Sequence, residues 1–205
     1  MVRVLFKLGL ALASLLLLCS PSMLLPQDSV SAGLNTSGSI VIDGHSTPYL
    51  IHHLPVSSFP NLPPDIQEQL DHRDCLIPQS YEARQPENVV HASLEHPGSS
   101  DWAVLCSAQG TVSLLVFFGS SSSQPFTLGS TPETERLQSH GSSGVLGFNW
   151  AIDPALPQDI HEAQLGMRHP PPRLDHDALA DSVIDRRTDY HFYLSNSWTL
   201  IETQD

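Results

Sequence analysis

Residues 90–118 constrain the fold most, because they contain three consecutive segments with strand patterns separated by glycine-containing turns. In residues 90–95, apolar and polar side chains alternate, which is typical of a strand with one buried face. Residues 101–106 and 111–118 are apolar at nearly every position, as in strands buried on both faces. The pattern predicts an antiparallel meander whose second and third strands are central in a sheet.

Other β-rich segments lie on either side of this meander. Residues 39–43 and 49–54 are short β-rich runs around a turn-like stretch, so they predict a hairpin. Residues 145–150 predict another strand, and residues 190–194 and 198–201 predict a closing hairpin. The chain is therefore expected to be rich in antiparallel sheet.

Two segments favour short helices. One helix is expected to begin after Pro63 and to end at Pro78, and a second is expected in residues 157–167. Residues 175–187 are ambiguous, and a helix capped by Asp177 is one interpretation. The fold class predicted is α+β, a single domain with a mostly antiparallel sheet and two or three short helices.

The first 32 residues resemble a signal peptide. A short basic start is followed by an uncharged Leu- and Ala-rich run over residues 8–18, which is shorter than the ~20 residues of a spanning helix. Small residues follow, so cleavage is expected between residues 22 and 33. An uncleaved signal anchor and a lipoprotein modified at Cys19 are the alternatives. The sequence therefore predicts an exported protein, in the periplasm or outside the cell.

The chain after the leader divides into an N-terminal segment, residues 33–54, and a β-rich domain, residues 55–205. Past residue 32 there are seven arginines and no lysine against 21 acidic residues, a net charge of about −14. This surface charge repels phosphate backbones and anionic lipids, so no nucleic-acid partner is expected. No membrane contact is expected after processing unless Cys19 is lipidated, and no cofactor is expected.

Cys75 and Cys106 are the only cysteines beyond the leader. In an oxidising compartment such a pair predicts one disulfide, which would connect the helix after Pro63 to the second strand of the meander. Metal ligation or a nucleophilic thiol is the alternative, but the sequence has no CxxC motif to favour either.

The most site-like acidic cluster contains Asp175, Asp177 and Asp181. Carboxylates at such spacing can gather around Ca²⁺, which takes about six to eight oxygen ligands. The glycine and glutamate of an EF-hand loop are missing, so a helix cap with solvated acids is the preferred interpretation and no metal site is predicted.

Eleven histidines raise the question of zinc, but their spacing does not match a zinc motif. His52 and His53 are adjacent and point to opposite faces if they lie on a strand. His161 and Glu162 are not followed by the second histidine of HExxH, and residues 141–144 are one residue short of GxSxG. No catalytic residue is assigned.

Four aromatic residues are candidates for lining a sugar or peptide groove, although filling the core is the more common role of such residues. They are Trp102, Trp150, Tyr193 and Trp198.

Several short strings are similar to those in a group of exported bacterial proteins without assigned activity. The strings are RDCLIPQ at 73–79, NVV at 88–90, DWAVLC at 101–106, LVF at 115–117, DHD at 175–177 and the closing Trp198. The resemblance covers most of residues 55–203. It implies one domain at the bacterial cell envelope or outside the cell, and it implies no catalytic residues.

Residues 88–118 are also similar to a single hairpin of the FG-GAP propeller type. The Asp-x-Asp-x-Asp-Gly calcium loop is absent and there is one copy, so neither a propeller nor its calcium is expected.

These observations favour a non-catalytic exported binding domain over an enzyme. A secreted hydrolase that uses carboxylates such as Asp175, Asp177 or Asp181 is the alternative. A cleft that brings two of these acids within ~10 Å of each other would favour the hydrolase.

Overall fold

The computed structural model describes residues 34–119, 124–165, 167–170 and 172–203. The predicted leader and its Cys19 lie outside the described residues. Within the described residues, no helix is long and apolar enough to cross a membrane.

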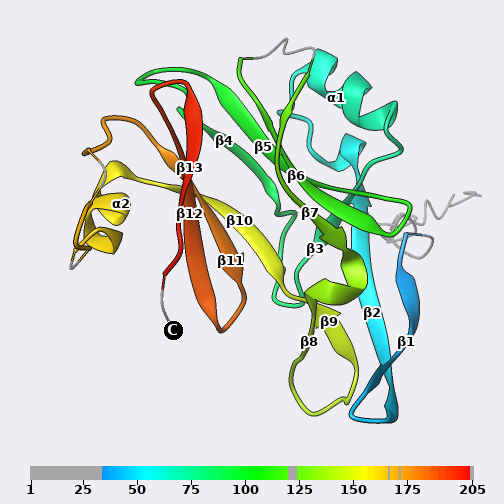
Figure 1. The fold of residues 1–205 in the computed structure, drawn as a ribbon. Helices are drawn as coiled ribbons and strands as arrows, with labels where there is room; N and C mark the ends of the chain where they lie inside the picture. Colours follow the sequence, from blue (N-terminus) through cyan, green and yellow to red (C-terminus); the bar gives the residue numbers. More distant parts are fainter. Residues whose placement is uncertain (1–33, 120–123, 166, 171, 204–205) are drawn as a thin grey trace, which may run out of the picture.

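A nine-stranded sheet forms most of the molecule, with the strand order β7-β6-β5-β3-β2-β9-β8 and with β1 and β4 paired to β2 and β5 (Figure 1). The strands of this sheet are β1 (Thr36–Ile42), β2 (His45–Pro55), β3 (Leu76–Gln79), β4 (Val89–Ala92), β5 (Asp101–Ala108), β6 (Thr111–Phe117), β7 (Phe126–Pro132), β8 (Leu137–Ser139) and β9 (Leu146–Phe148). The described pairings in it are antiparallel except for that of β2 with β9.

A second sheet has four antiparallel strands in the order β10-β11-β12-β13. Its strands are β10 (Trp150–Ala155), β11 (Ala178–Val183), β12 (Arg187–Leu194) and β13 (Ser197–Ile201). The α-helices are α1 (Pro64–Asp71) and α2 (Pro157–Ala163), and two 3₁₀ turns are η1 (Val56–Ser58) and η2 (Glu133–Arg136). The α+β fold class with a mostly antiparallel sheet is confirmed.

The elements form four layers, α1, the large sheet, the small sheet and α2 (Figure 1). Leu105 and Leu114 of β5 and β6 face the small sheet, where they join the core between the two sheets. Val104 and Leu115 face the opposite way, into the core under α1. These two central strands are covered on both faces, which is why they are apolar throughout.

The predicted meander and both predicted hairpins are confirmed, as β4-β5-β6, β1-β2 and β12-β13. Three of the hairpin turns have two consecutive residues with positive φ, the backbone of a tight type I′ turn. These pairs are Asp43 and Gly44, Gln109 and Gly110, and Ser195 and Asn196.

Cys75 and Cys106 form the predicted disulfide. Cys75 follows α1, and its backbone N–H donates to the carbonyl of Leu70 at 3.0 Å. Cys106 lies on the face of β5 that packs against Ile66 and Leu70. The bond therefore ties α1 to the centre of the large sheet.

The structure corrects the helical interpretation of residues 175–187. Residues 178–183 form β11, and the Asp177 carboxylate accepts from the backbone N–H of Ser93 at 3.0 Å instead of capping a helix. Leu179 and Val183 are four residues apart, an even number, so they share a face in a strand as they would in a helix. Leu179 faces the core between the two sheets, and its neighbours Ala178 and Ala180 face the core under α2. Because both faces of this part of β11 are covered, its sequence does not alternate between apolar and polar residues.

Two other boundaries differ from the sequence prediction. Helix α1 ends at Asp71, and the residues before Pro78 enter β3, which pairs with both β2 and β5. The single strand predicted at 145–150 is the whole of β9 followed by the first residue of β10. At Asn149 the chain passes from the large sheet to the small sheet, so one apolar stretch of sequence contributes a strand to each of the two sheets.

Asn88 joins the two sheets through its buried side chain. Its amide Nδ2 donates to the carbonyls of Pro78 and Trp150, at 2.7 and 3.2 Å, and its Oδ1 accepts from the backbone N–H of Ile152 at 3.0 Å. Its φ of 70° is a conformation that asparagine tolerates better than most residues. These bonds fix β10 against the end of β3, next to the candidate site.

Candidate binding pocket

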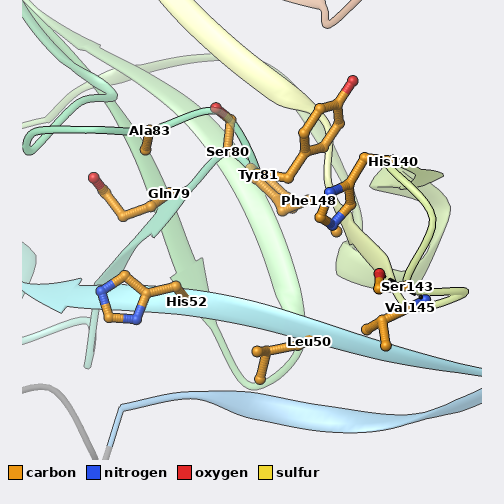
Figure 2. Close-up of a pocket in the computed structure, with 11 residues that line it drawn as sticks. Leu50, His52, Gln79, Ser80, Tyr81, Ala83, His140, Ser143, Val145 and Phe148 are labelled. Carbon is orange, nitrogen blue, oxygen red and sulfur yellow. Dashed lines mark hydrogen bonds between the residues drawn. The ribbon is translucent and has the colours of Figure 1, made fainter.

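A pocket of about 450 Å³ opens between β2, the segment that follows β3, and the loop between β8 and β9 (Figure 2). Its volume is in the range of sites for small molecules, about 300–1,000 Å³. The lining residues are Leu50, His52, Gln79, Ser80, Tyr81, Ala83, His140, Ser143, Val145, Gly147 and Phe148.

One wall of the pocket is a pair of stacked rings. The ring centroids of Tyr81 and His140 are 4.6 Å apart, and the two rings are inclined by 3° (Figure 2). A Cβ atom on Gly147 would lie 2.5 Å from Cβ of Tyr81 and 2.8 Å from Nε2 of His140. Position 147 therefore has no room for a side chain while these two rings hold their places.

The segment 79–83 is held by hydrogen bonds from its own polar groups. The Gln79 side chain donates to the carbonyls of Ile77 and Glu87, at 3.2 and 3.1 Å, and accepts from the N–H of Glu87 at 3.0 Å. The Glu87 carboxylate accepts from the N–H of Ser80 at 2.7 Å. The backbone N–H of Tyr81 donates to the carbonyl of Phe148 at 2.9 Å, which joins this segment to β9.

The hydroxyl of Tyr81 is also fixed. It donates to Asp185 at 3.0 Å and accepts from the side-chain amide of Gln138 at 3.1 Å. Partial burial, together with the hydrogen bond to Asp185 and its negative charge, raises the pKa of Tyr81 to about 12. Tyr81 therefore stays neutral at physiological pH, and it serves as a wall rather than as an acid or a base.

Tyr81, Ala83 and His140 also border a neighbouring hollow of about 790 Å³, which is lined further by Glu82, Arg84 and Asp185 among others. The residues that line the smaller pocket include no carboxylate, guanidinium or ammonium group. Charge is therefore confined to one side of the Tyr81–His140 wall.

His52 lines the pocket from β2, while its neighbour His53 is buried on the opposite face with 1% exposure, as the alternation of a strand predicts. Nδ1 of His52 is 2.6 Å from Oδ1 of Asn35, an acceptor, so Nδ1 carries the hydrogen and neutral His52 presents Nε2 as an acceptor. In the described part of the chain, Nε2 of His52 and both ring nitrogens of His140 have no hydrogen-bonding partner. They are available to a ligand.

The aromatic candidates from the sequence do not line this pocket. Trp150 is buried between the sheets, donates from Nε1 to Asp181 and lies under the guanidinium of Arg136, 4.0 Å from the ring centroid. Burial lowers the pKa of Arg136, although nearby Asp181 opposes this effect. Trp150 therefore has a structural role.

Tyr193 and Trp198 face each other across β12 and β13 with ring centroids 5.5 Å apart, and both contact Phe118, the residue after β6. This aromatic cluster joins the small sheet to the large one. Trp102 lies in the core under α1, stacks on His91 at 4.3 Å, and borders a hollow of about 550 Å³ beside Phe59 and Pro60.

The three acidic candidates do not converge on one cavity. Asp175 borders a shallow hollow of about 320 Å³ together with His176, Asp177 bonds to Ser93, and Asp181 accepts from Trp150 and from His191. A hydrogen bond from His176 lowers the pKa of Asp175, the opposite of what a general acid needs. Over residues 34–119, 124–165, 167–170 and 172–203, no three His, Cys, Asp or Glu side chains are placed to share a metal ion.

The residues that form the pocket carry no motif, which is why the sequence did not identify them. Tyr81 and His140 are 59 positions apart in the sequence and meet because β2 pairs with both β3 and β9 and because the Tyr81 N–H donates to the carbonyl of Phe148. The sole sequence signal is Gly147, a glycine inside an apolar strand pattern, which is typical of close backbone approach.

Comparisons with family models, with curated proteins and with solved structures gave no match to this chain. The resemblance to exported bacterial proteins and the predicted export therefore stay predictions.

Proposed function

We propose that this chain is a non-catalytic exported binding domain that holds a small uncharged molecule in the pocket between β2, Tyr81 and His140. The observation that carries the proposal is the construction of this pocket. Its walls are fixed by hydrogen bonds and ring stacking before any ligand arrives, so little conformational entropy is lost on binding.

The lining defines the chemistry of the ligand. Leu50, Val145 and Phe148 supply apolar surface, whereas His52, His140 and Ser143 supply hydrogen-bonding groups. Because no lining side chain carries a fixed charge, a charged ligand would lose hydration without gaining an ion pair. A neutral molecule with an apolar face and hydroxyl or amide groups fits this lining, and a neutral sugar ring has this chemistry.

Export is supported by the disulfide, since such bonds persist in oxidising compartments, and by the leader-like N-terminal sequence. The strongly acidic chain supports solubility and argues against nucleic-acid partners.

The test is a binding screen on the chain without its leader, using neutral sugars and each sugar's uronic acid counterpart, followed by calorimetry. Leu50→Asp places a carboxylate at the pocket and is expected to weaken binding of a neutral ligand at least about tenfold, or about 1.4 kcal/mol. Leu200→Asp on β13 is the matched control, because Leu50 and Leu200 are 46% and 44% exposed. Equal affinity in the two variants, or binding of the uronic acids alone, would contradict the proposal.

A further inference from the structure

Three of the seven arginines beyond residue 32 line one hollow of about 280 Å³ beside the turn between β11 and β12. Arg136 is the last residue of η2, Arg186 lies in the turn, and Arg187 is the first residue of β12. Burial lowers the pKa of the Arg136 guanidinium, and the positive charge of Arg187 adds to this effect, although nearby carboxylates oppose it. The arginines are therefore close enough to repel one another, and an anion among them would relieve the repulsion.

Backbone hydrogen bonds hold together the three segments that surround this hollow. The N–H of Asn149 donates to the carbonyl of Arg136 at 2.9 Å, and the N–H of Ile184 donates to the carbonyl of Asn149 at 2.9 Å. The N–H of Arg186 donates to the carbonyl of Val183 at 3.0 Å, which closes the turn. The backbone positions of the arginines are therefore fixed before any ligand binds.

The half-buried guanidinium of Arg136 uses one face and leaves its donors free. Its central carbon lies 4.0 Å from the ring centroid of Trp150, so the stack fixes the plane of the group. Asp181 lies nearby but is bonded to Trp150 and His191, and no other described residue offers Arg136 a hydrogen-bond acceptor or an ion pair. A guanidinium presents its five N–H donors as a fork that fits the two oxygens of a carboxylate.

The charges around the hollow favour a singly charged ligand. Arg187 is paired with Asp189 at 3.1 Å, and Glu135 also lines the hollow. Three guanidiniums and these two carboxylates leave one positive charge in excess. A monoanion offsets this excess, whereas a dianion would add negative charge to a chain that is already strongly acidic.

We propose that this hollow binds the carboxylate of a small acid with a short apolar chain. The carboxylate accepts from Arg136 and from Arg186, which likewise has no ion pair within the described ranges. Leu137 and Val183 line the same hollow and supply apolar surface for the chain of the acid. The site goes beyond the proposed function, because it shares no lining residue with the candidate pocket.

The test is nitrogen NMR of the arginine side chains while the chain without its leader is titrated at constant ionic strength. The probes are butyrate, its uncharged counterpart butyramide, and sulfate as a dianion. We expect butyrate to shift the Nε signal of Arg136 with a Kd on the order of 1 mM, and butyramide to leave it in place. Equal shifts at the exposed Arg84, an equal response to butyramide, or tighter binding of sulfate would overturn the proposal.

Two matched variants separate this site from general charge effects. Arg186→Gln removes a guanidinium at an exposed turn position and is expected to weaken butyrate binding about tenfold. Arg84→Gln makes the same change of charge at an exposed position outside the hollow and should leave the affinity within about twofold. Equal affinities in the two variants would contradict the site.

A third variant separates this site from the candidate pocket. Leu50→Asp is expected to weaken binding of a neutral ligand in the pocket and to leave butyrate binding unchanged. If no neutral ligand binds but butyrate behaves as expected, the proposed function fails and the carboxylate site stands. If Leu50→Asp abolishes butyrate binding, the acid occupies the candidate pocket and the carboxylate site fails.

Discussion

The layer under α1 and the pocket beside β2 belong to the same large sheet, but different interactions hold them together. Under α1, buried apolar side chains such as Ile66 and Leu70 pack around the disulfide. At the pocket, the walls are positioned by hydrogen bonds to Gln79 and by the Tyr81–His140 stack. We infer that the interactions that stabilise the fold and the interactions that shape the pocket lie in different parts of one sheet.

The largest effect on stability is expected at Glu133, whose buried carboxylate accepts hydrogen bonds from His53 and Ser107. Glu133→Ala leaves His53 and Ser107 buried without their partner, which should cost about 3–5 kcal/mol of unfolding free energy. Glu135→Ala, two residues later and exposed on the same turn, should cost less than about 0.5 kcal/mol. Chemical denaturation measures both, and equal losses would show that the buried pair is not an anchor.

The next largest effect belongs to the α1 layer alone. Cys75→Ser and Cys106→Ser should each cost about 3 kcal/mol, and the double variant little more, because each change breaks the same bond. Ligand affinity at the pocket should stay within about twofold of wild type. Thiol titration of the unfolded, unreduced chain checks the bond directly, and two free thiols would contradict it.

A smaller effect, confined to the pocket side, is expected for Gly147→Ala. Its new methyl group meets Tyr81 and His140, so the stack must shift, at a cost of about 1–3 kcal/mol together with most of the ligand affinity. Gly129→Ala in β7 is the control, because the nearest atom to its methyl group is 4.0 Å away. Chemical denaturation measures the unfolding free energy of the two variants, and calorimetry measures their ligand affinity. A Gly147→Ala variant with wild-type ligand affinity would show that the stacked Tyr81–His140 rings do not form a wall of the binding site.

The smallest effect is expected for Tyr81→Phe. It removes the hydrogen bonds to Asp185 and Gln138, worth about 1 kcal/mol, but leaves the ring on His140. Affinity should therefore change by less than about threefold. A large loss of binding would show that the hydroxyl itself contacts the ligand.

The sequence predicted the parts of the fold whose causes are local. Strands β5 and β6, the positions of the hairpin turns and the start of α1 after Pro63 follow from patterning and turn chemistry. Strand β11 was ambiguous for two reasons. The spacing of four between Leu179 and Val183 fits one face of a helix or of a strand, and a strand covered on both faces shows no alternation of apolar and polar residues. The pocket was missed because its residues come from segments that are distant in the sequence and are brought together by the pairing of β2 with both β3 and β9.

The same reasoning applies to the predicted binding residues. Trp150 and Trp102 are buried in the two cores that flank the large sheet, and Tyr193 and Trp198 pack with Phe118 where the sheets meet. The aromatic residue type correctly indicated burial for Trp150 and Trp102, whereas Tyr193 and Trp198 are half-buried. It did not indicate that Tyr81 would line the candidate pocket, because that depends on the contacts of the segment after β3 with His140 and Phe148.

The most direct test of the account is methyl NMR of the chain titrated with a neutral ligand found in the screen. The account predicts the largest shifts at the methyl groups of Leu50 and Val145, which line the pocket, with Leu200 on β13 unchanged. Val89 and Leu194 report on the hollows beside Trp102 and beside Asp175. Largest shifts at either of these, with Leu50 and Val145 unmoved, would contradict the central claim that the pocket between β2, Tyr81 and His140 is the binding site.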